Sequence, residues 1–322
     1  MMWRFIARRV GIAIPTLLGI IVLNFFLIQL APGDPASVLA GEQGAATPEY
    51  MAALRAKFAL DDPVYVQFLR YMGNTLTLDL GYSYRNDETV ASLILERLGA
   101  TLLLMITAFV VALILGTLLG LASAIGRSTW RDGVISTLAL ILYATPGFWL
   151  GLMLIWVFSI NLGWLPTSGF ETIGAFKQGW DRVLDVARHL ILPATALALF
   201  QMALYARLMR TSALEQLNQD FVTTARAKGA TEGRILVRHV MRNALLPIVT
   251  MAGIQAGNLI GGSLIIETVF GWPGLGTLAF NALQSRDVNL LLGIFMVSAV
   301  LVIVTNLLAD LVLVRLDPRM EA

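Results

Sequence analysis

Residues 100–125 read ATLLLMITAFVVALILGTLLGLASAI and contain no charged side chain. A helix needs about 20 mostly apolar residues to cross the roughly 30 Å hydrocarbon core of a bilayer. This run is long enough to do so. It predicts a transmembrane helix, so we expect lipid rather than water to surround much of this protein.

Five further apolar runs accompany this one, and the composition agrees with them. Of the 322 residues, 57% are hydrophobic and only 14% are charged, whereas a soluble domain has about a quarter charged residues. The first run follows Arg8 and Arg9 as in a signal peptide, but it exceeds the roughly 7–15 apolar residues of a cleavable segment, so we expect it to be retained. We predict an all-α integral membrane protein with six transmembrane helices, at about 10–31, 100–125, 134–160, 189–208, 245–266 and 289–313.

The basic residues set the expected orientation. Most of the 23 Lys and Arg residues fall near the two ends and in the segments after spans two and four, which the positive-inside rule makes cytoplasmic. We expect a multi-pass protein with both termini in the cytoplasm. Its parts are an N-terminal segment with the first span (1–31), an external helical loop (32–99), a five-span core (100–313) and a cytoplasmic tail (314–322).

The external loop 32–99 is too long to be a simple connection. Asp62 followed by Pro63 is a helix-start pattern, and the apolar residues after it predict an amphipathic helix. We therefore expect a small folded cap on the outer surface. A second external segment carries Trp164 and Trp180, the aromatic anchors expected at a membrane interface.

The cytoplasmic segment 209–244 has the pattern of two short helices joined by a glycine. We expect Asp220 to cap the first helix and Gly229 to end it, and Thr231 with Glu232 to start the second. Such an elbow suits docking into a groove of another protein. Its arginines equally suit a basic surface loop held by anionic lipid headgroups, so composition leaves both interpretations open.

The residues that the chain lacks exclude several kinds of chemistry. Without cysteine there is no thiol nucleophile, Cys-ligated zinc or iron–sulfur cluster, and only His189 and His239 remain for metal catalysis. No lysine directly follows a glycine, as a nucleotide-binding P-loop requires, which favours ATP hydrolysis on a separate subunit. We expect no catalytic residue, no metal site and no cofactor bound by this chain.

Three glycines, Gly271, Gly274 and Gly276, have a spacing that superficially resembles a dinucleotide-binding loop. No strand is expected before them, and the fingerprint requires one. The segment is instead predicted to form a turn at the outer membrane surface, with Trp272 at the interface.

Polar side chains inside the predicted spans are candidates for function because lipid offers them no partner. Gln201, Gln255 and Asn258 are predicted either to line a pathway or to form hydrogen bonds between helices. Asp310, near the cytoplasmic end of the last span, is predicted to form a structural ion pair with Arg315, with Arg207 and Arg210 as alternative partners. A proton-coupling role for Asp310 is the other interpretation. His189 is expected to be a boundary residue bonded to a neighbour rather than a metal ligand.

Residues 220–250 read DFVTTARAKGATEGRILVRHVMRNALLPIVT, and this stretch resembles the cytoplasmic signature loop of ABC importer permeases, EAAxxxG followed by Leu-Pro. The form is similar to that of the dipeptide, oligopeptide, glutathione and nickel permease family. Ala225 and Gly229 fit the pattern, whereas Thr223 and Thr224 stand where it has Glu and Ala. Other matching stretches are APGDP (31–35), LDDP (60–63), DLGYS (79–83), LPTSG (165–169), HLILPA (189–194), FGWPGLG (270–276) and DPR (317–319). The chain most resembles the first of the two permeases that such transporters use.

The resemblance implies a division of labour in a bacterial inner membrane. A second permease subunit, two ATPase subunits that bind ATP and Mg, and an extracytoplasmic solute-binding protein are the expected partners, with no nucleic acid. The elbow is expected to sit in a cleft of one ATPase. The implied coupling residues are Thr223, Thr224, Ala225, Arg226, Ala227, Lys228 and Gly229, with the small residues allowing close approach and the basic ones meeting acidic groups.

The function expected from these observations is that of a transmembrane subunit of an ATP-driven importer of dipeptides, oligopeptides or glutathione-like solutes. Nickel or another small solute is the alternative cargo within the same role. An ion-coupled secondary carrier is the alternative class, and it is disfavoured because no carboxylate is predicted near the bilayer midplane. An intramembrane enzyme is disfavoured because no nucleophile–base pair is evident.

Overall fold

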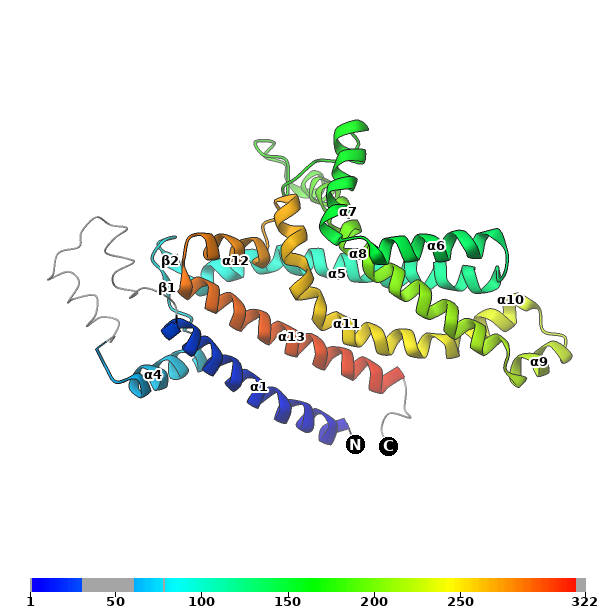
Figure 1. Ribbon diagram of the computed structural model, residues 1–322, viewed down its shortest axis with the longest axis horizontal. Helices are drawn as coiled ribbons and strands as arrows, with labels where there is room; N and C mark the ends of the chain where they lie inside the picture. The colour runs from blue at the N-terminus through cyan, green and yellow to red at the C-terminus, as the bar shows by residue number, and fades with distance from the viewer. Residues whose placement is uncertain (1, 31–60, 78, 317–322) are drawn as a thin grey trace. The chain divides into compact units, whose positions relative to one another are not determined.

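The computed structural model describes residues 2–30, 61–77 and 79–316, and helices dominate it, as the predicted all-α class requires (Figure 1). The chain divides into two units. The first comprises Met1–Glu96 and Leu278–Val300, and the second comprises Arg97–Thr277 and Leu301–Ala322. Three helices, α5 (Val90–Ile125), α12 (Leu275–Gln284) and α13 (Val288–Leu316), have residues in both units.

The first unit is built around α1 (Met2–Leu30) and α4 (Val64–Leu76). Phe25 of α1 packs edge-to-face on Phe68 of α4, with ring centroids 5.2 Å apart. Asn24 donates a hydrogen bond to the Leu292 carbonyl oxygen of α13 at 3.5 Å. The amphipathic helix predicted after Pro63 is therefore confirmed as α4, and one face of it packs on α1.

A two-strand ladder interrupts the helical pattern of this unit. β1 (Tyr82–Ser83) and β2 (Glu88–Thr89) pair antiparallel with Tyr82 opposite Thr89. The Ser83 hydroxyl donates to the carboxylate of Asp287, and Asp287 in turn accepts from the backbone N–H of Leu290 at 3.1 Å. Asp287 thus caps the start of α13 and ties it to the hairpin.

The second unit is built around α8 (Gly179–Leu217), which packs against α6 (Trp130–Ala144), α7 (Gly147–Leu154) and α11 (Met241–Phe270). Gly116 and Gly120 of α5 let that helix approach α8 closely. A Cβ on Gly116 would lie 2.8 Å from the Tyr205 Cβ, and one on Gly120 would lie 2.7 Å from the Met209 Cβ. Small residues at such contacts are typical of helix packing in membranes.

Four described helices are long and apolar enough to cross a membrane: Val90–Ile125, Gly179–Leu217, Glu232–Ala256 and Val288–Leu311. Two bent pairs would bring the number to six if each pair is one crossing. The apolar part of α1, Gly11–Leu27, is shorter. The predicted runs at 100–125, 189–208, 245–266 and 289–313 overlap the four long helices, whereas the count of six crossings stays a prediction.

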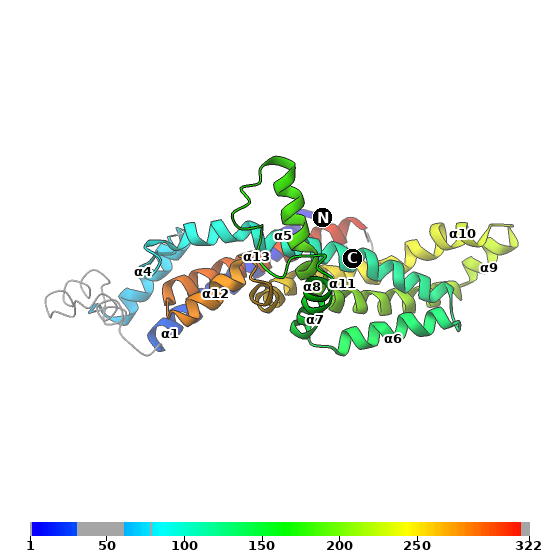
Figure 2. The ribbon, with the colours of Figure 1, turned by 90° about the horizontal axis from the view of Figure 1, so that it is seen from above.

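The predicted single helix at 134–160 is wrong. α6 ends at Ala144, and the chain bends by 109° before continuing as α7 and the π-helical η1 (Ile155–Asn161), a turn visible in Figures 1 and 2. Thr145 is extended, with φ −87° and ψ 132°. The ring of Pro146 disfavours helical geometry at the residue before it, so this one proline breaks an otherwise continuous apolar run.

Candidate functional site

The elbow between α8 and α11 forms as two short helices around a glycine. α9 (Asp220–Ala227) ends at Gly229, whose φ of +79° is left-handed, and α10 (Glu232–Ile235) and η2 (Leu236–Val240) lead into α11 (Figure 1). The Ala230 N–H donates to the Ala225 carbonyl oxygen at 3.1 Å, and the Gly229 N–H donates to that of Arg226 at 2.9 Å. These two bonds are a Schellman helix end. Gly229 is required by the backbone and not by space, because a Cβ there would meet nothing within 4 Å.

The elbow has a buried side and an exposed side. Val222, Ala225 and Ile235 belong to the core of the second unit. Six of the seven predicted coupling residues are exposed: Thr223, Thr224, Arg226, Ala227, Lys228 and Gly229. Ala225 differs from the other six, because at 8% exposure its methyl group packs against the chain's own core; its role in coupling stays a prediction.

Arg226 and Glu232 form a two-bond ion pair across the elbow. The Arg226 Nε donates to one carboxylate oxygen at 2.7 Å and its terminal nitrogen donates to the other at 3.1 Å. This hydrogen-bonded carboxylate raises the pKa of the Arg226 guanidinium above its usual value. Arg226 was expected to meet an acidic group of a partner, yet in this chain it already has one. Both side chains are about half exposed or more, so the pair contributes little to stability and can be exchanged for another partner at small cost.

Asp220 does not cap α9, contrary to expectation. Gln219 occupies the N-cap position, no side-chain cap bond forms, and Asp220 is the first helical residue. A carboxylate in the first turn still interacts favourably with the helix dipole. Thr224 donates to the Asp220 carbonyl oxygen at 3.0 Å, so its hydroxyl is satisfied within the helix.

Glu267 is a functional candidate that the sequence reasoning missed. It lies in the last turn of α11, one residue beyond the predicted span, and is fully buried. The Thr101 hydroxyl donates to Oε1 at 2.9 Å, and the backbone N–H groups of Gly276 and Thr277 donate to Oε2 at 2.7 and 3.1 Å. The carboxylate therefore sits at the N-terminus of α12, where the orphan N–H groups and the helix dipole compensate for burying it.

The glycines around this carboxylate explain the FGWPGLG segment. Gly271 ends α11 with a φ of +58°, and a Cβ on Gly274 would lie 2.4 Å from the carboxylate of Glu267. The prediction of a turn is confirmed, but the placement of Trp272 at the interface is wrong. Trp272 is fully buried, and its indole N–H donates to the Ala100 carbonyl oxygen at 2.8 Å. A loop that encloses a carboxylate is also a poor site for a dinucleotide phosphate.

A second buried ionic cluster lies at the start of α6. Arg210 donates from Nε and from a terminal nitrogen to the two oxygens of Asp132, at 2.7 and 2.8 Å. The Ser123 hydroxyl adds a 2.6 Å bond to the same carboxylate. Bidentate geometry with an additional donor is what a buried ion pair needs to offset desolvation. The cluster joins α5, α6 and α8, and only an isolated Asp in a short connection signalled it in the sequence.

Comparison with known proteins places these features in a family. The model of the family described as binding-protein-dependent transport system inner membrane component matches residues 116–322, and the model of its N-terminal part matches 2–105. The chain belongs to this family. It is thus a multi-pass inner membrane component of a transport system, as the resemblance of the elbow segment implied.

Curated relatives match this membrane component over its whole length. It is 42% identical over 322 residues to the oligopeptide transport system permease protein AppB of Bacillus subtilis, covering 98% of this chain and 99% of the relative. It is 38% identical over 336 residues to the di/tripeptide transport system permease protein DppB of Pseudomonas aeruginosa, covering 99% of each. A solved structure of the MetNI methionine ABC transporter, in an inward-facing conformation, aligns with a TM-score of 0.56 and 17% identity over 70% of this chain and 97% of the other. That last likeness supports the fold alone.

The structure excludes one of the three predicted ion-pair partners of Asp310. Arg210 pairs with Asp132, so it is not the partner of Asp310. Among the described residues of the chain, Arg207 forms no ion pair. The side chain of Arg315 lies outside the described residues, and its pairing with Asp310 stays a prediction.

Of the three predicted pathway residues, the structure describes the side chains of two, Gln201 and Gln255. Gln201 is buried on α8, and among the described atoms its side-chain oxygen has no hydrogen-bond partner. Gln255 is half-buried on α11, and the side chain of Asn258 lies outside the described residues. Whether these three residues line a path stays a prediction.

The segment before span four is folded tightly against α8. Asp185 accepts from the Thr172 backbone N–H at 2.6 Å and from Lys177 at 2.6 Å. His189 donates from Nδ1 to the Asp185 carbonyl oxygen at 2.8 Å, which confirms the expectation of a histidine bonded to a neighbour. Trp164 and Trp180 are largely exposed, and their role as interface anchors stays a prediction.

Proposed function

We propose that this chain is a transmembrane subunit of an ATP-driven importer of dipeptides or oligopeptides. The names of the full-length relatives support peptides as the cargo, and the family description supports a binding-protein-dependent system. The expected partners are a second permease, two ATPases and an extracytoplasmic solute-binding protein. ATP and Mg bind to the ATPases, and both termini of this chain lie in the cytoplasm.

The observation that carries the proposal is the exposed side of the elbow. Six residues of α9 and its end, between Thr223 and Gly229, are exposed to solvent, while Val222 and Ala225 pack the same helix against the core. Because one side of α9 is packed against the core, a displacement of its exposed side by a partner would move the core as well. The proposed path of coupling therefore runs from an ATPase through α9 into α8 and α11, the helices that flank it.

The test compares two glycines of the elbow in the complete complex, reconstituted into vesicles. Gly229→Ala forces a side chain into left-handed geometry at a cost of about 1–2 kcal/mol, whereas Gly233→Ala adds the same methyl group in open space with ordinary helical geometry. We expect Gly229→Ala to reduce ATP-dependent peptide uptake severalfold and Gly233→Ala to leave it within about twofold. Equal uptake by the two variants would remove the elbow from the coupling path.

The same vesicles decide between cargoes and between transport classes. Uptake of nickel or glutathione without competition by peptides would replace the proposed cargo within the same role. Glu267 is a buried carboxylate of the kind that ion-coupled carriers use, so that class has a specific observation in its favour. Uptake driven by a proton gradient in the absence of ATP, and lost in Glu267→Gln, would establish the carrier instead.

A further inference from the structure

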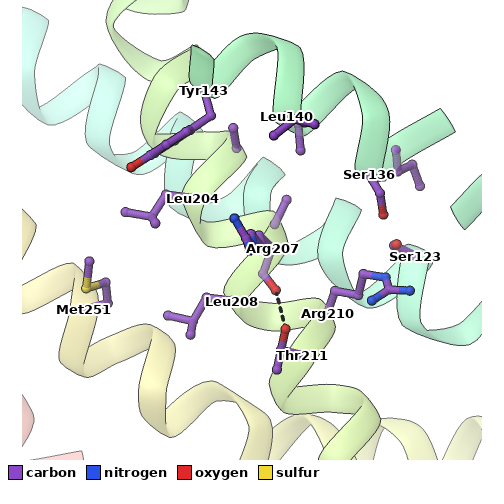
Figure 3. A pocket seen from close by; sticks show the side chains of 14 residues that line it. Ser123, Ser136, Leu140, Tyr143, Leu204, Arg207, Leu208, Arg210, Thr211 and Met251 are labelled. Carbon is purple, nitrogen blue, oxygen red and sulfur yellow. Dashed lines mark hydrogen bonds between the residues drawn. The ribbon is translucent and has the colours of Figure 1, made fainter. Parts of the chain in front are cut away.

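A cavity of about 740 Å³ lies in the second unit, apart from the elbow and from Glu267 (Figure 3). It is walled by α5, α6, α8 and α11, and its volume falls in the range of about 300–1,000 Å³ that small-molecule sites occupy. Most of its wall is aliphatic, with Ile135 and Leu140 on α6, Leu204 and Leu208 on α8, and Met251 on α11.

The cavity also has a cationic part. Figure 3 shows Arg207 on α8 between these aliphatic side chains, with Thr211 one turn further along the helix. The charge of Arg210, which also lines the cavity, is neutralised by Asp132. Arg207 is exposed and forms no ion pair within the described residues. Arg207 therefore places a positive charge beside an aliphatic wall, and the two together complement a ligand with an anionic end and an apolar part.

We infer that this cavity binds an anionic phospholipid of the surrounding bilayer, with its phosphate at Arg207 and an acyl chain along Leu140, Leu204 and Leu208. Arginine is well suited to phosphate, which it binds through two parallel hydrogen bonds. Thr211 also lines the cavity one turn further along α8, but its hydroxyl already donates to the Arg207 backbone carbonyl oxygen at 3.2 Å, so Arg207 is the group that would hold the phosphate. The ligand is thus an amphipathic anion, in a site separate from the proposed coupling surface.

A peptide fits this cavity less well than a lipid does. A peptide carries an ammonium group as well as a carboxylate, and the described residues that line the cavity include no carboxylate. Asp132, close behind Arg210, has both oxygens occupied by Arg210 and accepts from Ser123 as well. The positive charge of a peptide would therefore have no counterpart, whereas an anionic lipid needs only Arg207 and the aliphatic wall.

The test measures lipid retention by the purified complete complex. The complex is stripped of lipid in detergent, titrated with dioleoyl phosphatidylglycerol or dioleoyl phosphatidylcholine, and weighed intact by native mass spectrometry. We expect one phosphatidylglycerol per copy of this chain to be retained preferentially over phosphatidylcholine. Arg207→Gln should weaken that retention about fivefold, the ratio corresponding to the roughly 1 kcal/mol contributed by one basic side chain at an anionic lipid surface.

Three control variants keep the test decisive. Arg207→Lys keeps the charge and should retain most of the binding, while Arg242→Gln removes another exposed arginine, which does not line the cavity, and should leave binding unchanged. Ala139→Phe adds bulk to the cavity wall and should exclude the lipid even with Arg207 present.

Two outcomes would overturn the inference. Equal loss of phosphatidylglycerol in Arg207→Gln and Arg242→Gln would mean that the lipid responds to overall charge and not to the cavity. Displacement of the lipid by a dipeptide, with dipeptide binding itself lost in Arg207→Gln, would assign the cavity to the transported solute. Neither outcome depends on the elbow, so the proposed coupling function is judged separately by the two glycine variants.

Discussion

In two turns of the second unit a left-handed glycine ends a helix, but the two turns differ in burial and in the charges that they contain. Gly229 ends α9 at the elbow and Gly271 ends α11 before α12, with φ values of +79° and +58°. The elbow is exposed and is crossed by one surface ion pair, Arg226 with Glu232. The other turn is buried around the carboxylate of Glu267, which accepts hydrogen bonds from a side chain and from two backbone N–H groups.

The comparison shows that the same helix end, a left-handed glycine, can either leave a surface exposed or enclose a buried charge. At the elbow the glycine only reverses the chain, and the outward surface stays free for a partner. At the second turn the backbone after the glycine wraps a charge so closely that neither Gly274 nor Gly276 has room for a side chain. We therefore expect changes at the elbow to affect transport more than stability, and changes at the Glu267 turn to affect stability more than transport.

The largest effect is expected from Glu267→Ala. The substitution leaves the Thr101 hydroxyl and the N–H groups of Gly276 and Thr277 buried without their acceptor, at about 1–3 kcal/mol for each unsatisfied group. We expect the free energy of unfolding to fall by about 3 kcal/mol or more, measured by thermal unfolding of the purified complex in detergent. Unchanged unfolding would show that water or a rearranged backbone replaces the carboxylate, and the contrast between the turns would fail.

The next largest effect is expected from Gly274→Ala, which we compare with Gly229→Ala. Gly274→Ala places a methyl group against the Glu267 carboxylate and should lower the free energy of unfolding by about 1–3 kcal/mol through overpacking. Gly229→Ala carries only the backbone strain of about 1–2 kcal/mol. The sharper measurement is the ratio of uptake to folded protein, which should fall in Gly229→Ala and stay near the wild-type value in Gly274→Ala. The reverse pattern would exchange the roles assigned to the two turns.

A smaller effect is expected from Trp272→Phe. The ring stays buried beside Phe170, which it contacts edge-to-face at 4.9 Å, but the hydrogen bond from the indole N–H to the Ala100 carbonyl oxygen is lost. We expect a loss of about 1 kcal/mol in the free energy of unfolding. Phe170→Leu is a matched control, because it removes the ring contact and keeps the hydrogen bond. A neutral Trp272→Phe would mean that the hydrogen bond to Ala100 adds nothing measurable to stability and that burial of the ring alone matters.

The smallest effect is expected from Glu232→Ala. It removes the exposed ion pair with Arg226, so the unfolding temperature should change only slightly, and that change should vanish at high salt. If the exposed guanidinium is then free to bind an acidic group of an ATPase, the complex should assemble at least as well as with wild-type protein. A loss of several kcal/mol in the thermal unfolding measurement would mean that the bridge holds the elbow together.

The accuracy of the sequence-based predictions varied with the range over which each residue acts. The glycine end at Gly229 and the helix after Pro63 were predictable, because backbone geometry is decided by neighbours in the chain. The break at Thr145 and Pro146 was also readable in principle, since proline acts on the residue before it, but the hydropathy of the surrounding run concealed it. Glu267 was missed because it lies one residue beyond the predicted span, and the groups that hold it come from Thr101 and from the start of α12.

By itself, the sequence determined that lipid is the solvent of this protein, where its four long apolar helices lie, and where the elbow bends. Hydropathy and backbone preference are properties of short stretches, so no tertiary contact is needed to read them. Only the tertiary structure decided that Arg210 pairs with Asp132, that Trp272 is buried and that Ala225 faces inward, because the partners of these groups lie on other helices. Burial turns such side chains from exposed polar or aromatic groups into contacts that join one helix to another.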